Sequence, residues 1–199
     1  AGLLVVSGAA AQSPHTHHHR FDDAGKWAQV FDDPRRDAWQ KPHEVIQALA
    51  LKPDAVIADI GAGTGYFTAR LAHMTPKGRV YAVDTEPDMV RYVAERAKRA
   101  GLANVVALEG RPDDPGLPQK VDLALFVDVY HHVEARERYL RRLRDSLAPG
   151  GRVAVIDFRL EAPIGPPRAA RIAPDAVKKE FRSSGYALVA EHDFLPHQY

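Results

Sequence analysis

A glycine-rich turn between a buried strand and a helix constrains this chain more than any other feature. Residues 55–71 read AVIADIGAGTGYFTARL, in which an apolar run typical of a buried parallel strand leads into Gly61, Gly63 and Gly65. Residues 66–74 then have the apolar spacing of a helix. A strand, a glycine turn and a helix in this order let doubly wound proteins bring bare backbone against a nucleotide-like ligand. The sequence therefore predicts an enzyme that binds a small-molecule cofactor.

The spacing of the glycines excludes two common nucleotide-binding motifs. A dinucleotide fingerprint needs glycine or alanine at its last position, and that position falls here on Tyr66 or Thr68, both too bulky. A P-loop needs a Gly-Lys-Ser/Thr ending, which this motif lacks. The pattern D-x-G-x-G-x-G that begins at Asp59 instead resembles the first motif of the class I S-adenosylmethionine-dependent methyltransferases. A tight turn that binds no ligand is the alternative interpretation.

The same resemblance implies a set of donor-binding residues. Asp84 directly follows the second predicted strand, residues 79–83, and a carboxylate at this position can bind both ribose hydroxyls. Asp84 is also placed to cap the next predicted helix. Met89 lies where the family packs an apolar side chain on adenine, although a core methionine is the alternative. The residues expected to bind S-adenosyl-L-methionine are Asp59, Gly61, Ala62, Gly63, Gly65, Asp84, Thr85, Met89, Asp113 and Asp128.

The resemblance covers about residues 45–194, with the segments in family order. Alternating strands and helices predict an α/β fold with a doubly wound, mostly parallel sheet of the Rossmann-like class I type. Tyr130-His131-His132 and the turn at residues 147–152 are most similar to the small-molecule branch of ubiquinone and menaquinone biosynthesis methyltransferases. The further strands are expected at residues 105–108, 122–128 and 153–157, and the further helices at residues 86–100, 135–147 and 175–184.

One departure from the family pattern concerns the adenine contact. The family often has Gly-Asp-Ala after the third strand, whereas here Gly110 is followed by Arg111 and Pro112. Asp113 or Asp114 is the expected substitute.

The expected reaction is an in-line displacement of a methyl group from a sulfonium, in which proximity supplies most of the rate. A general base is needed only if the acceptor carries a proton at neutral pH. His131 and His132 are the candidate bases, since they follow the fourth predicted strand; a histidine at this position often only hydrogen-bonds backbone. Asp128 is placed to contact the donor's amino group or to orient a histidine. The expected acceptor is a small molecule, apolar or aromatic; the alternative is a non-catalytic donor-binding or partner-subunit domain.

Composition excludes several other functions. The 199 residues are 45% hydrophobic and 27% charged, which is ordinary for one globular domain. A net charge of +1 gives no general attraction to nucleic acid or anionic lipid. The absence of cysteine excludes a cysteine-ligated iron–sulfur cluster and a thiolate nucleophile.

The chain is expected to divide into a disordered leader at residues 1–20, an N-terminal helical cap at residues 21–54 and, as the resemblance implies, a methyltransferase domain at residues 55–199. A short apolar run and small residues make the leader similar to the end of a signal peptide, so export and a cytoplasmic location are both open. The leader is too short to span a membrane, and its histidine cluster lacks a carboxylate framework, so no metal site is expected. The cap has helical spacing at residues 24–31 and 42–51, with a turn-rich link between.

The C-terminal residues predict a sixth strand at residues 186–192, followed by a turn through Pro196. In the family a seventh, antiparallel strand inserts between strands five and six, but only Tyr199 remains here to form it. The last antiparallel strand is therefore expected to be missing or truncated, with about five to eight more residues in the natural chain.

Overall fold

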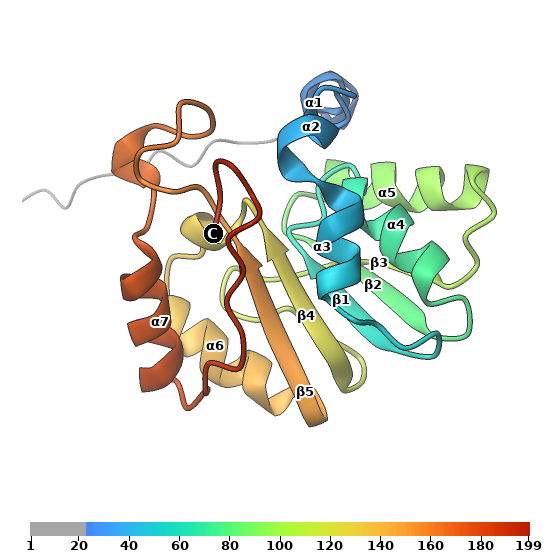
Figure 1. Cartoon of the computed structure of the whole chain (residues 1–199). Helices are drawn as coiled ribbons and strands as arrows, with labels where there is room; N and C mark the ends of the chain where they lie inside the picture. The colour runs from blue at the N-terminus through green and yellow to red at the C-terminus, as the bar shows by residue number, and fades with distance from the viewer. Residues whose placement is uncertain (1–22) are drawn as a thin grey trace, which may run out of the picture.

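The computed structural model describes residues 23–199, so the predicted leader with its apolar run and histidine cluster lies outside the described part. Helices and strands alternate along most of this length (Figure 1). The elements are α1 (Ala24–Phe31), α2 (Arg36–Gln40), α3 (Pro42–Ala48), β1 (Val56–Ile60), α4 (Tyr66–Met74), β2 (Arg79–Asp84), α5 (Pro87–Arg99), β3 (Val105–Glu109), β4 (Val121–Val127), η1 (Tyr130–His132), α6 (Arg136–Asp145), β5 (Leu147–Ile156), η2 (Arg168–Ala170) and α7 (Pro174–Ser183).

The five strands form one sheet in the order β3-β2-β1-β4-β5, and every neighbouring pair is parallel. Parallel pairs need crossover connections, which the helices between the strands supply. The strand order changes direction between β1 and β4, and ligands of doubly wound proteins bind at such a point, outside the carboxyl ends of the strands. The α/β, doubly wound sheet that the sequence predicts is confirmed.

Helices cover both faces of the sheet, because strands buried on both sides must be shielded from water on both sides. On one face α3 and α4 bury Ile46, Phe67 and Leu71 against the strands. On the other face α6 and α7 bury Leu143 and Val177. The short α1 and α2 lie above the carboxyl ends of the strands and form, with α3, the cap (Figure 1).

Two short segments differ from the sequence-based expectation. Residues 36–40 form α2, although they read as part of a turn-rich link. The turn expected at residues 147–152 belongs to β5: between Val121 and Leu123 of β4, the pairing advances from Leu147 to Arg152, so the intervening residues bulge out of the ladder. Local pattern does not reveal either feature, because both depend on the neighbour against which the segment packs.

The predicted sixth strand at residues 186–192 is wrong. Within residues 23–199 no strand pairs with this segment, and Leu188 and Val189 are 53% and 82% exposed. Alternating apolar residues indicate a strand only when a hydrogen-bonding neighbour is present.

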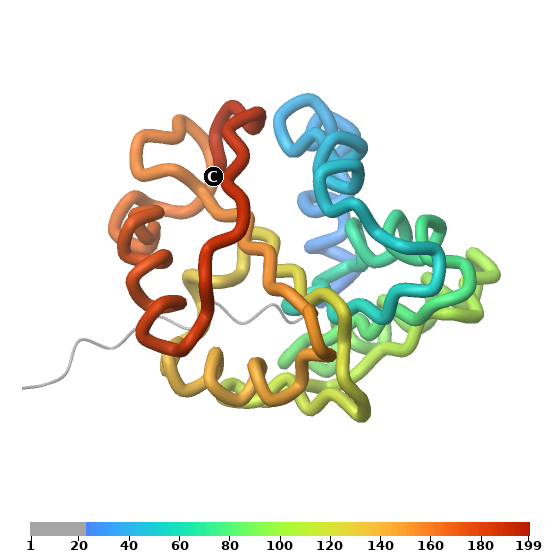
Figure 2. Tube along the Cα trace, turned by 60° about the horizontal axis from the view of Figure 1, so that its bottom comes forward, coloured from blue at the N-terminus to red at the C-terminus, as the bar shows by residue number. Residues whose placement is uncertain are grey.

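The last three residues pair instead with the segment that follows β5. Tyr199 and Asp157 exchange two backbone hydrogen bonds of 3.0 and 3.2 Å, and the amide of Arg159 donates to the carbonyl of His197 at 2.9 Å. The pairing is antiparallel and is centred on Phe158 and Gln198. Figures 1 and 2 both place the end of the chain beside the carboxyl end of β5. Residues 197–199, hereafter the C-terminal segment, therefore reach the edge of the sheet where a ligand is expected.

Within residues 23–199, none of the helices combines the length and the apolar character that a membrane span requires.

The close packing of Gly61 gives a test of the turn. Gly61 and Gly101 share a φ of +68°, but a Cβ on Gly61 would lie 2.2 Å from Val129, whereas one on Gly101 would meet no atom of the described part of the chain within 4 Å. Gly61→Ala should therefore lower the free energy of unfolding by about 2–4 kcal/mol, from backbone strain plus overpacking, and Gly101→Ala by about 1 kcal/mol, from strain alone. Urea unfolding measures both, and equal losses would contradict the packing argument.

Candidate functional site

Three aspartates lie at the same edge of the sheet. Asp59 is in β1, Asp84 is the last residue of β2, and Asp128 directly follows β4. Because β1 lies between β2 and β4, the parallel order brings all three to the carboxyl ends of adjacent strands. The structure thus brings together three of the residues that the sequence assigns to the donor site.

Gly61 and Gly65 let the turn after β1 pack tightly. Both have positive φ, and a Cβ on Gly61 or Gly65 would come within 2.2 Å of Val129 or 2.7 Å of Val93, respectively. These two glycines are required by the protein's own packing, since larger residues would push the turn away from the segment after β4 and from α5.

Gly63 differs from both neighbours. Among residues 23–199, a Cβ at Gly63 would have only the ring of Phe31 within 4 Å, at 3.6 Å, so its backbone faces the cap rather than the core. The amide of Gly63 donates to Oδ2 of Asp84 at 2.8 Å, and Oδ1 of Asp84 accepts from the amide of Glu86 at 3.0 Å. Glu86, not Asp84, is the cap residue of α5. Burial raises the pKa of Asp84, and its carboxylate retains unused lone pairs for a ligand hydroxyl.

Asp59 is buried behind the glycine turn. Its Oδ2 accepts a hydrogen bond of 2.6 Å from the hydroxyl of Thr68 in α4, and it is 3% exposed. Burial raises the pKa of Asp59 to about 6, with the Thr68 hydrogen bond opposing the change.

Asp128 has a left-handed backbone, with φ of 58°, which is unusual for a residue other than glycine. Its carboxylate accepts from the amide of Gln198 through Oδ1 and from Arg36 through Oδ2, at 3.4 Å. Burial raises the pKa of Asp128 to about 7, although Arg36 and Gln198 both favour the ionised form. The pKa of this carboxyl group at the end of β4 therefore lies near neutral pH.

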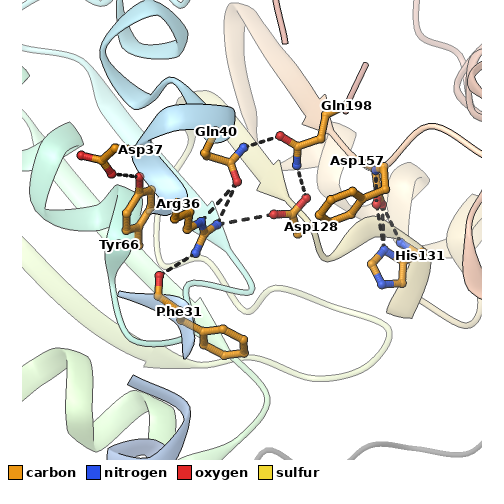
Figure 3. A network of polar contacts seen from close by, with 10 residues as sticks. Phe31, Arg36, Asp37, Gln40, Tyr66, Asp128, His131, Asp157 and Gln198 are labelled. Atoms are coloured by element: carbon orange, nitrogen blue, oxygen red, sulfur yellow. Dashed lines mark hydrogen bonds and ion pairs between the residues drawn. The ribbon is translucent and has the colours of Figure 1, made fainter. Parts of the chain in front are cut away.

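Arg36 of the cap is the cation that lies between Asp128 and the ring of Tyr66 (Figure 3). It donates to the carbonyl of Phe31 at 3.0 Å and to Oε1 of Gln40 at 3.1 and 3.2 Å. Its guanidinium also lies over the ring of Tyr66, 4.1 Å from the centroid. Burial lowers the pKa of Arg36, which nevertheless stays charged because an arginine titrates so far above neutrality.

The two predicted histidines have different surroundings. The side chain of His131 is 3% exposed, and its Nδ1 lies 2.9 Å from both carboxylate oxygens of Asp157. His132 is exposed and contacts His131 ring to ring, with centroids 4.2 Å apart. The carboxylate that orients His131 is therefore Asp157 and not Asp128. Asp157 was visible in the sequence only as the end of the fifth strand.

The remaining predicted residues are more dispersed. Ala62 lies in the glycine turn, Thr85 is exposed after β2, and Met89 is buried in α5 at 1% exposure. The carboxylate of Asp113 pairs with two arginines of α6, Arg142 at 2.7 Å and Arg138 at 3.4 Å. The structure thus engages Asp113 with a helix rather than leaving it open toward a ligand.

Sequence reasoning missed Arg36, Gln40, Asp157 and Gln198 as members of the site. Gln40 and Gln198 hydrogen-bond at 2.7 Å although 158 positions separate them. No motif marks such pairs, because a single glutamine or arginine has no spacing that signals its partner.

The buried Asp59 makes stability depend on pH. Its pKa is about 6 in the folded protein against 3.8 ordinarily, so the unfolded chain ionises first as pH rises, and folding loses stability between about pH 4 and pH 6. Asp59→Asn does not titrate, so the stability of the variant relative to the native protein should grow by about 3 kcal/mol across that window. Urea unfolding at several pH values measures this, with the exposed Asp54→Asn as control. A difference that stays constant with pH would show that Asp59 is not perturbed.

Comparison with known proteins agrees with this architecture. A protein-L-isoaspartate O-methyltransferase of Aeropyrum pernix is 35% identical over 127 residues, 62% of this chain and 44% of that protein. A trans-aconitate 2-methyltransferase of Rhodopseudomonas palustris is 29% identical over 133 residues, 67% of this chain and 48% of that protein. The chain spans about half the length of the curated relatives it matches.

Solved structures share the fold. A SAM-dependent methyltransferase from Aquifex aeolicus superimposes with a TM-score of 0.81 and 26% identity, over 88% of this chain and 95% of that one. The cyclase SpnF has the same fold, with a TM-score of 0.64 and 21% identity over 74% of this chain and 56% of that one. The family model described as "Methyltransferase domain" matches residues 51–194, which is more than half of the chain. The protein therefore belongs to a family of S-adenosylmethionine-dependent methyltransferase domains.

Proposed function

We propose that the protein transfers the methyl group of S-adenosylmethionine to a small-molecule acceptor. The observation that carries the proposal is the position of Gly63: its backbone faces the cap, and its amide is hydrogen-bonded to Asp84. A bare backbone beside a carboxylate at the carboxyl end of β2 suits an adenosine, whose ribose hydroxyls need an acceptor.

The residues present fit this donor. It carries two ribose hydroxyls, an ammonium and a carboxylate, and the site offers Asp84 for the hydroxyls, Asp59 or Asp128 for the ammonium, and the cation Arg36. The turn residues Gly61, Ala62 and Gly65, together with Thr85 and Met89, complete the proposed donor site, whereas the Asp113 carboxylate is engaged by arginines of α6 and is not part of it.

The chemistry asked of the protein is mainly positioning. When bound, S-adenosylmethionine supplies a methyl group on a positively charged sulfur, which is already activated for displacement. The residues of the site hold donor and acceptor in line and exclude water, so proximity supplies most of the rate. For an acceptor that carries a proton, we propose that His131, oriented by Asp157, takes it, with His132 as the second candidate.

Support for a small-molecule acceptor comes from the trans-aconitate relatives, whose names state one. The finer resemblance to quinone biosynthesis enzymes rests on Tyr130-His131-His132 and on residues 147–152 alone. The isoaspartate relative acts on a protein by its name, and the cyclase SpnF shows that this fold also carries other chemistry.

Formation of S-adenosylhomocysteine tests the function directly. Incubation of the protein and S-adenosylmethionine with a small-molecule metabolite extract should release it, whereas a purely donor-binding domain would bind the donor in calorimetry and release none. A protein fraction of the same extract serves as the comparison for a macromolecular acceptor.

Donor affinity should depend on the Asp84 carboxylate. Asp84→Ala removes a carboxylate that accepts hydrogen bonds from the ribose hydroxyls. Each such bond to a charged group is worth about 1.5–3 kcal/mol, so affinity for S-adenosylmethionine should fall at least about tenfold. Isothermal titration calorimetry measures the change. Asp145→Ala, an exposed aspartate in α6, is the control. Unchanged affinity in Asp84→Ala would leave Asp84 a purely structural residue that ties the turn to α5.

The position of Gly63 gives a second test of the donor site. Gly63→Val and Gly101→Val both place a side chain at positive φ, +54° and +68°, and neither Cβ would come closer than 3.6 Å to another described residue, so their losses of stability should be similar. Only Gly63→Val fills the space in front of the turn, and it should abolish donor binding in calorimetry. Native affinity in a folded Gly63→Val protein would refute the proposed site.

A further inference from the structure

Four side chains from three distant parts of the chain form a closed ring of hydrogen bonds (Figure 3). Arg36 donates to Gln40 at 3.1 Å, Gln40 donates to Gln198 at 2.7 Å, Gln198 donates to Asp128, and Arg36 closes the ring on Asp128 at 3.4 Å. Arg36 and Gln40 come from α2, Asp128 follows β4, and Gln198 is in the C-terminal segment. The ring thus connects the cap, the sheet edge and the C-terminal segment at the proposed donor site.

The charged members set the direction of the ring. A guanidinium only donates hydrogen bonds and a carboxylate only accepts them. Gln40 must therefore turn its oxygen to Arg36 and its nitrogen to Gln198, which in turn directs the nitrogen of Gln198 to Asp128. The side-chain amide of each glutamine therefore uses its oxygen as an acceptor and its nitrogen as a donor, and the arrangement suits an ionised Asp128.

The two glutamines are fully buried, at 0% exposure. A buried amide without partners costs free energy, so the ring has a narrow range of acceptable geometries. Gln198 is fixed from its own side as well, because backbone pairing of the C-terminal segment with residues 157–159 fixes its backbone. Its amide therefore stands at a defined place beside Oδ1 of Asp128.

Several charged groups face Asp128 from the elements packed around it. Arg36 of α2 favours the carboxylate, as does His131 of η1, while Asp157 after β5 opposes it. Arg36 contacts only Oδ2, at 3.4 Å, so Gln198 is the partner that defines where Oδ1 points.

We infer that Gln198 is a positioning residue, which holds the carboxylate of Asp128 in the orientation that receives the amino-acid part of the donor. The inference rests on the proposed function, and it makes the C-terminal segment a component of the donor site. Gln198 acts through Asp128 and does not itself touch the donor.

Two ligands separate this role from a general structural one. S-adenosylhomocysteine carries the amino-acid part, and methylthioadenosine shares its adenine, ribose and sulfur but lacks that part. In Gln198→Leu the affinity for S-adenosylhomocysteine should fall about tenfold, the effect of one hydrogen bond to a charged group, while that for methylthioadenosine should change less than about twofold. Calorimetry at pH 7.5 measures both, and Gln119→Leu, an exposed glutamine, is the control.

A second variant preserves the shape of the side chain if Gln198→Leu fails to fold. Gln198→Glu places a second carboxylate beside Asp128, so affinity for S-adenosylhomocysteine should be weakest at pH 8. The affinity should recover toward pH 6, because the introduced carboxyl can then hold a proton and donate it in a hydrogen bond to Asp128. The native protein should show no such recovery over that interval.

The outcomes distinguish the inference from the function beneath it. Native protein that binds neither ligand would overturn the proposed function. Native binding of both ligands, with affinities unchanged in the two Gln198 variants or lowered equally for both ligands, would overturn the positioning role alone. Loss confined to S-adenosylhomocysteine, with the pH-dependent recovery in Gln198→Glu, supports it.

Discussion

The burial of carboxylates at one edge of the sheet is the constraint on which the rest of the site depends. A buried carboxylate is costly unless hydrogen bonds and a nearby cation compensate it. Asp84 is compensated by the amides of the glycine turn and of Glu86, Asp59 by the Thr68 hydroxyl, and Asp128 by Gln198 and Arg36. The compensation is incomplete, since the pKa values of all three remain raised. A site of this kind is poised to receive a ligand with hydroxyls and a positive charge.

The need for a cation explains why the cap is attached where it is. Arg36 lies between Asp128 and the ring of Tyr66, and an ion pair of 2.8 Å between Asp32 and Arg96 joins the end of α1 to α5. Arg96 also donates to the carbonyl of Thr64 in the glycine turn at 2.9 Å. The cap is thus bound through charged contacts to the same turn and strand ends that form the proposed donor site. A change in the charge at that site is therefore expected to affect the attachment of the cap.

The C-terminal segment serves the same edge from the opposite side. Its backbone pairs with Asp157, which orients His131, while the side chain of Gln198 reaches Asp128. Two carboxylates of the site are therefore placed by three residues of chain. These residues are not in a regular strand, yet they have a defined position because backbone hydrogen bonds tie them to residues 157–159 and the side chains of Gln198 and Tyr199 are hydrogen-bonded as well.

The sequence by itself determined the parallel sheet, the order of its strands along the chain and the glycine turn. The tertiary structure decided which side chains meet at the carboxyl ends of the strands. β1, α4 and β2 follow from short-range patterns: an apolar run, three glycines and a helical period within about thirty residues. The helix α2, the bulge in β5 and the absence of a strand at residues 186–192 depend on neighbours far along the chain. The ring through Arg36, Gln40, Asp128 and Gln198 is the extreme case, since a hydrogen bond between residues 158 positions apart leaves no periodic trace and exists only once the sheet has brought its ends together.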